Sequence, residues 1–151
     1  TPVFLNRLGI RGLILDVDNT LTTHNNPVPL PGVPQWIAEM KDHGIGLMIL
    51  SNNHPERVRP FAQMLDLPFV ADGKKPLSSG MRRATQAMGL TKDQVAIVGD
   101  QLFTDIWAGN HYGCVSILVE PIEPEQTGFL AVKRRWERPI LKAYHRRRGR
   151  E

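Results

Sequence analysis

The sequence predicts a single α/β domain with a Rossmann-like, doubly wound parallel sheet of about five strands. Three observations support this fold class. Short, nearly continuous apolar runs alternate with helix-like segments along the chain. The runs lack a polar residue at every second position, which is typical of strands covered on both faces. The chain has 151 residues and is 41% hydrophobic, which suits one domain with a substantial core.

Each element has a local justification in the sequence. We expect strands at residues 13–16, 46–50, 68–71, 95–98 and 115–119, and helices at about 33–43, 55–65, 77–88 and 103–108. Gly44 and Gly89 stand where glycine commonly ends a helix. Pro55 suits the first turn of a helix, whereas Pro60 is expected to bend or shorten that helix.

Charge is distributed unevenly along the chain. The net charge is +4, but residues 129–151 contain nine Lys or Arg and two Glu, whereas residues 1–128 carry ten basic and thirteen acidic side chains. We therefore divide the chain into a core at 1–128 and a basic tail at 129–151. The apolar residues Phe129, Val132, Trp136, Ile140 and Tyr144 recur at helical spacing, so the tail is expected to be an amphipathic helix interrupted near Pro139.

The chain carries no obvious export or membrane-crossing signal. It contains no apolar run long enough to span a bilayer and does not open with a secretory pattern. Its single cysteine, Cys114, begins an apolar run and is expected to be a buried, inert thiol. We expect a reducing, cytoplasmic setting. Within it, the basic tail is a candidate for peripheral attachment to a membrane.

The most informative stretch is Asp16-Val17-Asp18-Asn19-Thr20, directly after the first buried run. Two carboxylates at this spacing leave the carboxyl end of a strand, which is where open α/β sheets bind ligands. Such a pair can bind a divalent cation, or divide nucleophilic attack and proton transfer between them. A strand-ending turn, where Asp and Asn are common, is the simpler alternative.

The later strands also end in polar groups useful for phosphate chemistry. Ser51 and Asn52 follow the second strand, Lys75 follows the third, and Gly99-Asp100 ends the fourth with Asp105 close behind. A phosphate dianion repels an attacking carboxylate, so the chemistry needs a cation, which we expect to be Mg²⁺ held by Asp16 and Asp100. Lys75, Ser51, Asn52 and backbone N–H groups are expected to bind phosphate oxygens, and Asp18 to protonate the departing alcohol.

These residues, in this order, resemble the four motifs of the haloacid dehalogenase superfamily. The resemblance covers about residues 10–120, and the strings Ser51-Asn52-Asn53, Lys75-Pro76 and Gly99-Asp100-x-x-x-x-Asp105 are similar to the YqeG-type IIIA phosphatases. That subgroup is in turn similar to mitochondrial phosphatidylglycerophosphate phosphatase. The resemblance implies a phosphomonoester hydrolase in which Asp16 forms an aspartyl-phosphate.

The resemblance also implies roles for the other motif residues. Asp18 would be the general acid and base, and its main-chain carbonyl would join Asp16 and Asp100 around Mg²⁺. Asp105 would orient its neighbours, and Thr20 would support the first motif. Lys75 is preferred to Lys74 as the phosphate lysine because it stands directly before a proline, as in the subgroup.

Short intervals between the motifs leave no room for a cap domain. Asp16 and Ser51 are 35 positions apart, and the two following intervals span 24 and 25 positions. We therefore expect an open site, with residues 22–32 as the only candidate flap. An open site suits a phosphate displayed on something large, and phosphatidylglycerophosphate is a candidate substrate.

Other functions compete with this hypothesis. The basic tail suits an anionic membrane surface and nucleic acid equally, so an RNA- or ribosome-associated protein is one alternative. A non-catalytic phospho-receiver is another, although receivers place their acid pair adjacently and their acceptor Asp on a different strand. Steady turnover of a phosphorylated substrate would separate an enzyme from both.

Overall fold

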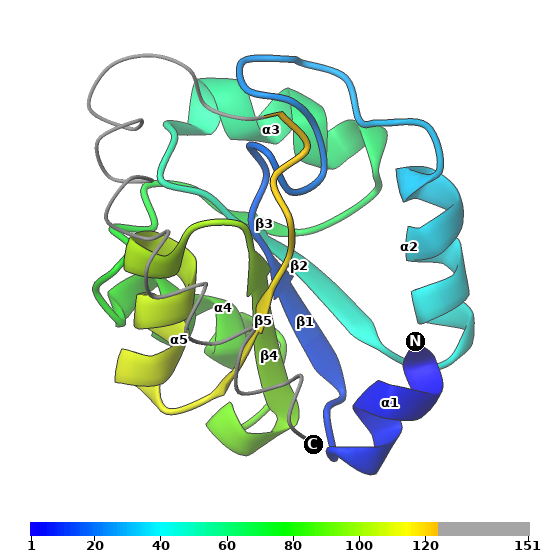
Figure 1. Cartoon of the computed structure of the whole chain (residues 1–151), viewed down its shortest axis with the longest axis vertical. Coiled ribbons are helices and arrows are strands. Elements are labelled where there is room, and N and C mark those ends of the chain that lie inside the picture. Colours follow the sequence, from blue (N-terminus) through cyan, green and yellow to red (C-terminus); the bar gives the residue numbers. More distant parts are fainter. Residues whose placement is uncertain (124–151) are drawn as a thin grey trace, which may run out of the picture.

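The computed structural model describes residues 1–123, which form a five-stranded parallel sheet flanked by helices (Figure 1). The strands are β1 (Gly12–Leu15), β2 (Gly46–Leu50), β3 (Phe69–Val70), β4 (Val95–Gly99) and β5 (Val115–Leu118). Their order in the sheet is β3-β2-β1-β4-β5, and every neighbouring pair is parallel. The predicted fold class is confirmed. The basic tail lies outside the described residues, so the predicted division at 128 stays a prediction.

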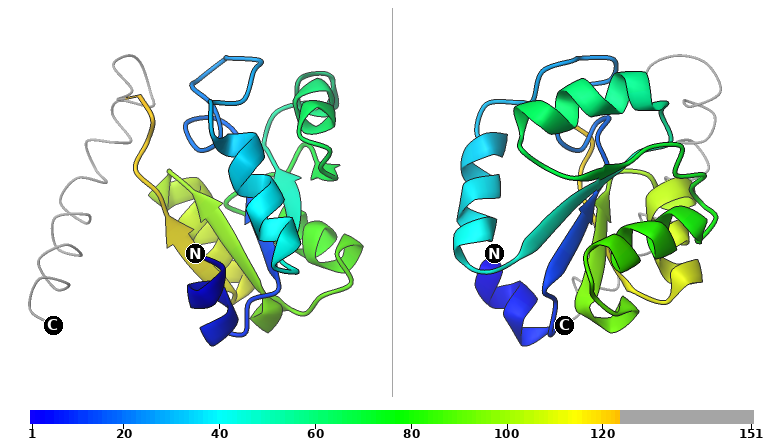
Figure 2. Two further views of the ribbon diagram at one scale, coloured as in Figure 1. Left: turned by 90° about the vertical axis from the view of Figure 1, so that its right-hand side faces the viewer. Right: turned by 180° about the vertical axis from the view of Figure 1, so that it is seen from behind.

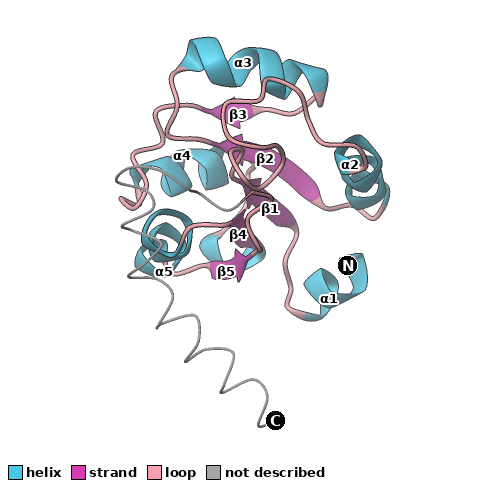
Figure 3. Cartoon of the chain, turned by 45° about the horizontal axis from the view of Figure 1, so that its top comes forward, coloured by secondary structure: helices cyan, strands magenta, loops and turns pink. Residues whose placement is uncertain are grey.

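Helices cover both faces of this sheet (Figure 3). They are α1 (Pro2–Arg7), α2 (Val33–Asp42), α3 (Pro55–Met64), α4 (Ser79–Ala87) and α5 (Trp107–Tyr112), together with a 3₁₀ turn at Lys92–Gln94 and a π-helix, η2, at Leu102–Ile106. Figure 2 shows the helices from two further directions around the sheet.

The two faces of the sheet carry separate apolar cores, because successive side chains of a strand point to opposite sides. Leu13 and Leu15 of β1 belong to the cluster that includes residues of α2 and α3. Ile14, between them, belongs to the cluster that includes residues of α4 and α5. Both faces are therefore apolar, which explains why the strands read as continuous apolar runs.

Three local features differ from the sequence prediction. Helix α1 was not predicted; Thr1 caps it and Leu5 anchors it in the core. Helix α3 continues through Pro60 to Met64, so the proline does not shorten the helix, while the expected bend stays a prediction. Its exposed side carries the proline, while Phe61 on the other side packs in the core and holds the helix against the sheet.

The third difference is the geometry of the segment after β4. The predicted helix at 103–108 is instead η2 followed by α5, and the Ile106 N–H donates to the Gln101 carbonyl five residues back at 3.2 Å. A π-turn is wider than an α-turn and changes where its side chains point. This turn delivers Asp105 to the buried end of β4.

Strand order fixes where a ligand site can form. The chain moves outward from β1 to β2 and β3, then crosses back to place β4 on the other side of β1. A reversal of this kind leaves a crevice at the carboxyl ends of the strands on either side of it. Within residues 1–123 no domain is inserted between the strands, and none of the helices there is long and apolar enough to cross a membrane.

Candidate active site

Asp16 stands at the point where the strand order reverses. Its N–H donates to the Val98 carbonyl of β4 at 2.9 Å, so the backbone ladder continues one residue past β1. Lys75 Nζ lies 2.5 Å from Asp16 Oδ1, and the Thr20 hydroxyl donates to Oδ2 at 3.3 Å. Both carboxylate oxygens are held by partners on different loops, which fixes the direction in which the carboxylate faces.

Lys75 brings a positive charge into the interior of this site. Its side chain is only 2% exposed, and its ammonium group lies between Asp16 and Asp105, 2.6 Å from Asp105 Oδ1. The Asn52 side chain accepts from the Lys75 N–H at 2.8 Å and donates to the Lys75 carbonyl at 3.0 Å. The structure thus places Lys75 against Asp16, whereas Lys74 is exposed.

Asp105 is held rigidly beneath this lysine. Its other oxygen, Oδ2, accepts from the Gln101 N–H at 3.2 Å, and its side chain is 1% exposed. The last residue of β4, Gly99, packs directly against the Asp105 carboxylate, and a Cβ at this position would overlap it. A glycine is therefore required here to admit the carboxylate.

Three carboxylates converge on one point at the end of the sheet. Asp16, Asp100 and Asp105 each offer an oxygen, and these oxygens all lie within 4.8 Å of one another. Together with Lys75 the cluster has a formal charge of −2. Buried carboxylate oxygens are ligands for hard divalent cations such as Mg²⁺, so the donor set and its charge fit such an ion.

The surroundings of Asp16 change its acidity. Burial, followed by the charge of Asp105, raises the pKa of Asp16 from 3.8 to about 7, although the Lys75 ammonium opposes the shift. Burial lowers the pKa of Lys75, but the charges of Asp105 and Asp16 outweigh it and raise the pKa overall. Lys75 is therefore charged, while Asp16 gives up its proton more readily when another cation lies beside it.

Asp18 points toward a different group of residues. Asn53 Nδ2 donates to its Oδ2 at 2.7 Å, and the Arg57 guanidinium donates to its Oδ1 at 2.7 Å. The Asp18 carboxylate is not part of the three-carboxylate cluster. The sequence predicted no role for Asn53 or Arg57. Their position just after the second strand is the one signal in the sequence that places them near the site.

The remaining predicted residues, Ser51 and Asn52, lie at the end of β2. The Ser51 hydroxyl is buried and accepts from the Asn53 N–H at 3.1 Å. Asn52 uses its side-chain amide on the Lys75 peptide, so it positions the lysine. Its predicted contact with phosphate stays a prediction, as does that of Ser51.

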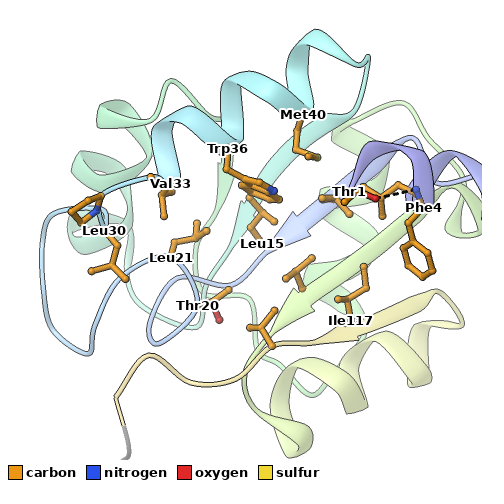
Figure 4. Close-up of a pocket in the computed structure, with 16 residues that line it drawn as sticks. Thr1, Phe4, Leu15, Thr20, Leu21, Leu30, Val33, Trp36, Met40 and Ile117 are labelled. Carbon is orange, nitrogen blue, oxygen red and sulfur yellow. Dashed lines mark hydrogen bonds between the residues drawn. The ribbon is translucent and has the colours of Figure 1, made fainter. Parts of the chain in front are cut away.

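An apolar pocket lies between α2 and the sheet (Figure 4). It has a volume of about 480 Å³ and is lined mainly by aliphatic and aromatic side chains, among them Leu21, Leu30, Trp36 and Ile117. Thr20, which hydrogen-bonds Asp16, also lines this pocket. None of the side chains that line it is charged, in contrast to the acidic cluster around Asp16.

Comparison with known proteins identifies the family. Residues 24–113 match the haloacid dehalogenase-like hydrolases. The chain is 38% identical over 147 residues to "Probable phosphatase YqeG" of Bacillus subtilis (strain 168), which covers 97% of this chain and 86% of that protein. It is 26% identical over 153 residues to "Phosphatidylglycerophosphate phosphatase 1, chloroplastic/mitochondrial" of Arabidopsis thaliana, covering 95% of this chain but only 44% of that protein.

Solved structures agree with the fold. The E. coli K-12 protein NagD superposes with a TM-score of 0.63 at 15% identity, over 76% of this chain and 90% of that one. The family match and the Bacillus relative confirm the predicted resemblance and the enzyme class. The chain belongs to the haloacid dehalogenase-like hydrolases and is a phosphatase of that family.

Proposed function

We propose that this phosphatase hydrolyses phosphate monoesters in two steps through an aspartyl-phosphate on Asp16. The observation that carries the proposal is the position of the Asp16 carboxylate. It accepts hydrogen bonds from Lys75 and Thr20, and one of its oxygens lies within 4.8 Å of oxygens of Asp100 and Asp105, close enough for one metal ion to bind all three. Asp105 contacts the same lysine, but its side chain is 1% exposed against 13% for Asp16, so Asp16 is the more accessible of the two to a substrate.

In the first step a carboxylate oxygen of Asp16 attacks phosphorus, and the bond between phosphorus and the alcohol oxygen breaks. Asp18 gives its proton to that oxygen, so the alcohol leaves neutral. In the second step a water attacks phosphorus, Asp18 takes a proton from it, and the bond to Asp16 breaks to release inorganic phosphate. Lys75, with Ser51 and backbone N–H groups, binds the non-bridging oxygens.

Asp16 and Asp100, with the Asp18 main-chain carbonyl, would hold Mg²⁺. A bound cation would neutralise phosphate oxygens and so lower the repulsion between the dianion and the attacking carboxylate. We propose Mg²⁺ because oxygen donors and a compact site suit a small, hard cation.

The decisive experiment is direct detection of the phosphorylated residue. Wild-type enzyme with Mg²⁺ is quenched with acid during turnover of an aryl phosphate, and its peptides are analysed by mass spectrometry. We expect a phosphoryl group on the peptide that contains Asp16, and no turnover by the Asp16→Asn variant. Turnover by Asp16→Asn at the wild-type rate would overturn the assignment of the nucleophile.

For the substrate, we propose a phosphate displayed on a large or surface-bound molecule, with phosphatidylglycerophosphate as the first candidate. The name of the Arabidopsis relative and the absence of a cap within residues 1–123 favour this choice. A panel of lipid, sugar and nucleotide monoesters tests it. Preference for a soluble sugar phosphate over the lipid would contradict it.

The basic tail at 129–151 fits an anionic membrane surface in this proposal. Flotation of the full chain with anionic and neutral vesicles, compared with a variant in which Arg146, Arg147 and Arg148 are replaced by Gln, tests the assignment. Selective loss of binding to anionic vesicles is expected for the variant. Binding to RNA with a steep dependence on salt, and no binding to vesicles, would favour the nucleic-acid alternative instead.

A further inference from the structure

The Asp18 carboxylate is anchored at both of its oxygens by neighbouring side chains. Arg57 donates to Oδ1 and Asn53 to Oδ2, each at 2.7 Å. The Asp18 side chain is 17% exposed and that of Arg57 is 32% exposed. Because each oxygen has its own donor, the carboxylate can neither rotate about its axis nor swing away without breaking a hydrogen bond.

The two anchors come from a different part of the fold from Asp18 itself. Asp18 lies in the loop after β1, whereas Asn53 follows β2 and Arg57 lies in the first turn of α3. In Figure 1 the loop after β1 and α3 both lie at the carboxyl end of the sheet. A helix packed on the core therefore sets the position of a side chain that belongs to a loop.

Arg57 also differs from a phosphate-binding arginine. Its guanidinium is paired with the Asp18 carboxylate, so its charge is already compensated. Lys75 supplies the positive charge at Asp16 instead. The geometry accordingly gives Arg57 a role that acts through Asp18.

We propose that Arg57, assisted by Asn53, is a positioning residue that fixes Asp18 for proton transfer to the leaving group. The inference rests on the proposed function, in which Asp18 is the general acid. General acid catalysis contributes about 10²- to 10⁴-fold and depends on the placement of the proton donor. Freeing Asp18 therefore removes part of that factor without touching the nucleophile.

The consequence is a characteristic dependence on the leaving group. A nitrophenolate departs readily without a proton, whereas a phenol with electron-donating groups or an alkyl alcohol needs one. For Arg57→Ala we expect kcat/KM to fall less than about threefold with 4-nitrophenyl phosphate. With poorly departing alcohols we expect a fall of about tenfold or more.

The test is a series of substituted aryl phosphates and one alkyl phosphate, with log kcat/KM plotted against the pKa of the leaving alcohol. Arg57→Ala is expected to give a steeper slope than wild type, and Arg57→Lys, which keeps one donor, an intermediate slope. The matched control is Arg59→Ala, because Arg59 lies two residues further along α3, is exposed and lies near the Phe69 ring. It is expected to keep the wild-type slope.

Thermal unfolding of each variant separates this effect from damage to the fold. A uniform loss with every substrate, or a change confined to KM, would overturn the positioning role. Asp18→Asn provides the separate check on the general acid: it is expected to give the steepest slope. If Asp18→Asn keeps the wild-type slope, the general acid assignment fails. If Asp18→Asn has a steep slope but Arg57→Ala keeps the wild-type slope, only the positioning role of Arg57 is rejected.

Discussion

Lys75 and Asp105 form an ion pair of 2.6 Å in which both side chains are almost completely buried. The same ammonium group holds Asp16 from the other side. A buried charge needs its partners, because removal of one member leaves the others desolvated and uncompensated. Lys75 is therefore expected to support both the stability of the fold and the chemistry of Asp16.

Replacing Lys75 tests this double role. Lys75→Met keeps most of the side-chain volume but removes the charge, and we expect it to destabilise the protein by about 3 to 5 kcal/mol. Turnover should fall by about 10²-fold or more. Lys74→Met is the matched control, since Lys74 is exposed and should change neither quantity appreciably. Urea unfolding and steady-state kinetics measure the two effects, and equal behaviour of the two variants would contradict the assignment.

The raised pKa of Asp16 predicts how metal-free protein responds to pH. Because its pKa rises from 3.8 to about 7 on folding, protonated Asp16 favours the folded state, and this contribution is lost as pH rises from about 4 through 7. In the presence of EDTA, the free energy of unfolding of the wild type should therefore fall more than that of Asp16→Asn between pH 5 and pH 8. The difference should be a few kcal/mol, since each unit of change in a pKa corresponds to about 1.4 kcal/mol. Parallel urea midpoints for the two proteins would contradict this.

Metal binding should show the opposite trend with pH. The cation and the proton compete for Asp16, so the affinity for Mg²⁺ is expected to rise as pH increases from 6 to 8. Below pH 7 the dependence should approach about tenfold per pH unit for one proton. Calorimetric titration at several pH values measures it, and an affinity independent of pH would argue against Asp16 as a ligand.

A substitution at Gly99 should impair the site through steric overlap alone, without any change in charge. In Gly99→Ala the added methyl group would overlap the Asp105 carboxylate, so Asp105 and the lysine above it must shift. We expect a loss of about 1 to 3 kcal/mol in stability and a clear drop in kcat. Gly46→Ala is the control, because its Cβ would meet the flexible end of Met88 at 3.2 Å and the Arg11 carbonyl at 3.6 Å, which is an ordinary contact. Equal kcat values for the two variants would overturn the prediction.

Cys114 is partly buried and not fully buried as the sequence predicts, but it should still be chemically quiet. Burial raises the pKa of its thiol to about 11, so the reactive thiolate is scarce at pH 8. Iodoacetamide is expected to label the folded protein much more slowly than protein unfolded in urea, and Cys114→Ala should retain turnover. Rapid labelling accompanied by inactivation would instead assign the thiol a role.

Much of the site was predictable because the fold converts strand ends into neighbours. Asp16, Lys75 and Asp105 are 59 and 30 positions apart along the chain, yet parallel strands bring their loops to one edge of the sheet. Each comes after an apolar run in the sequence, so its place at the carboxyl end of a strand could be predicted before any side-chain position was known.

Other features depend on contacts that no sequence pattern encodes. Arg57 resembles any charged residue on an exposed helix turn until the fold brings the first turn of α3 to Asp18 in the loop after β1. Asn52 looked like a phosphate ligand, but its amide turns to the Lys75 peptide in the loop after the neighbouring strand, β3. The π-turn before α5 was likewise not predicted, because its residues read as an ordinary short helix.

The hollow beside Thr20 offers a separate route to inhibitors. Phosphate mimics carry negative charge, which hinders their entry into cells and their approach to three carboxylates. A neutral, apolar compound seated between Trp36 and Ile117 would instead touch Thr20, which hydrogen-bonds Asp16. The enzyme could thus be controlled by a molecule that does not imitate its substrate.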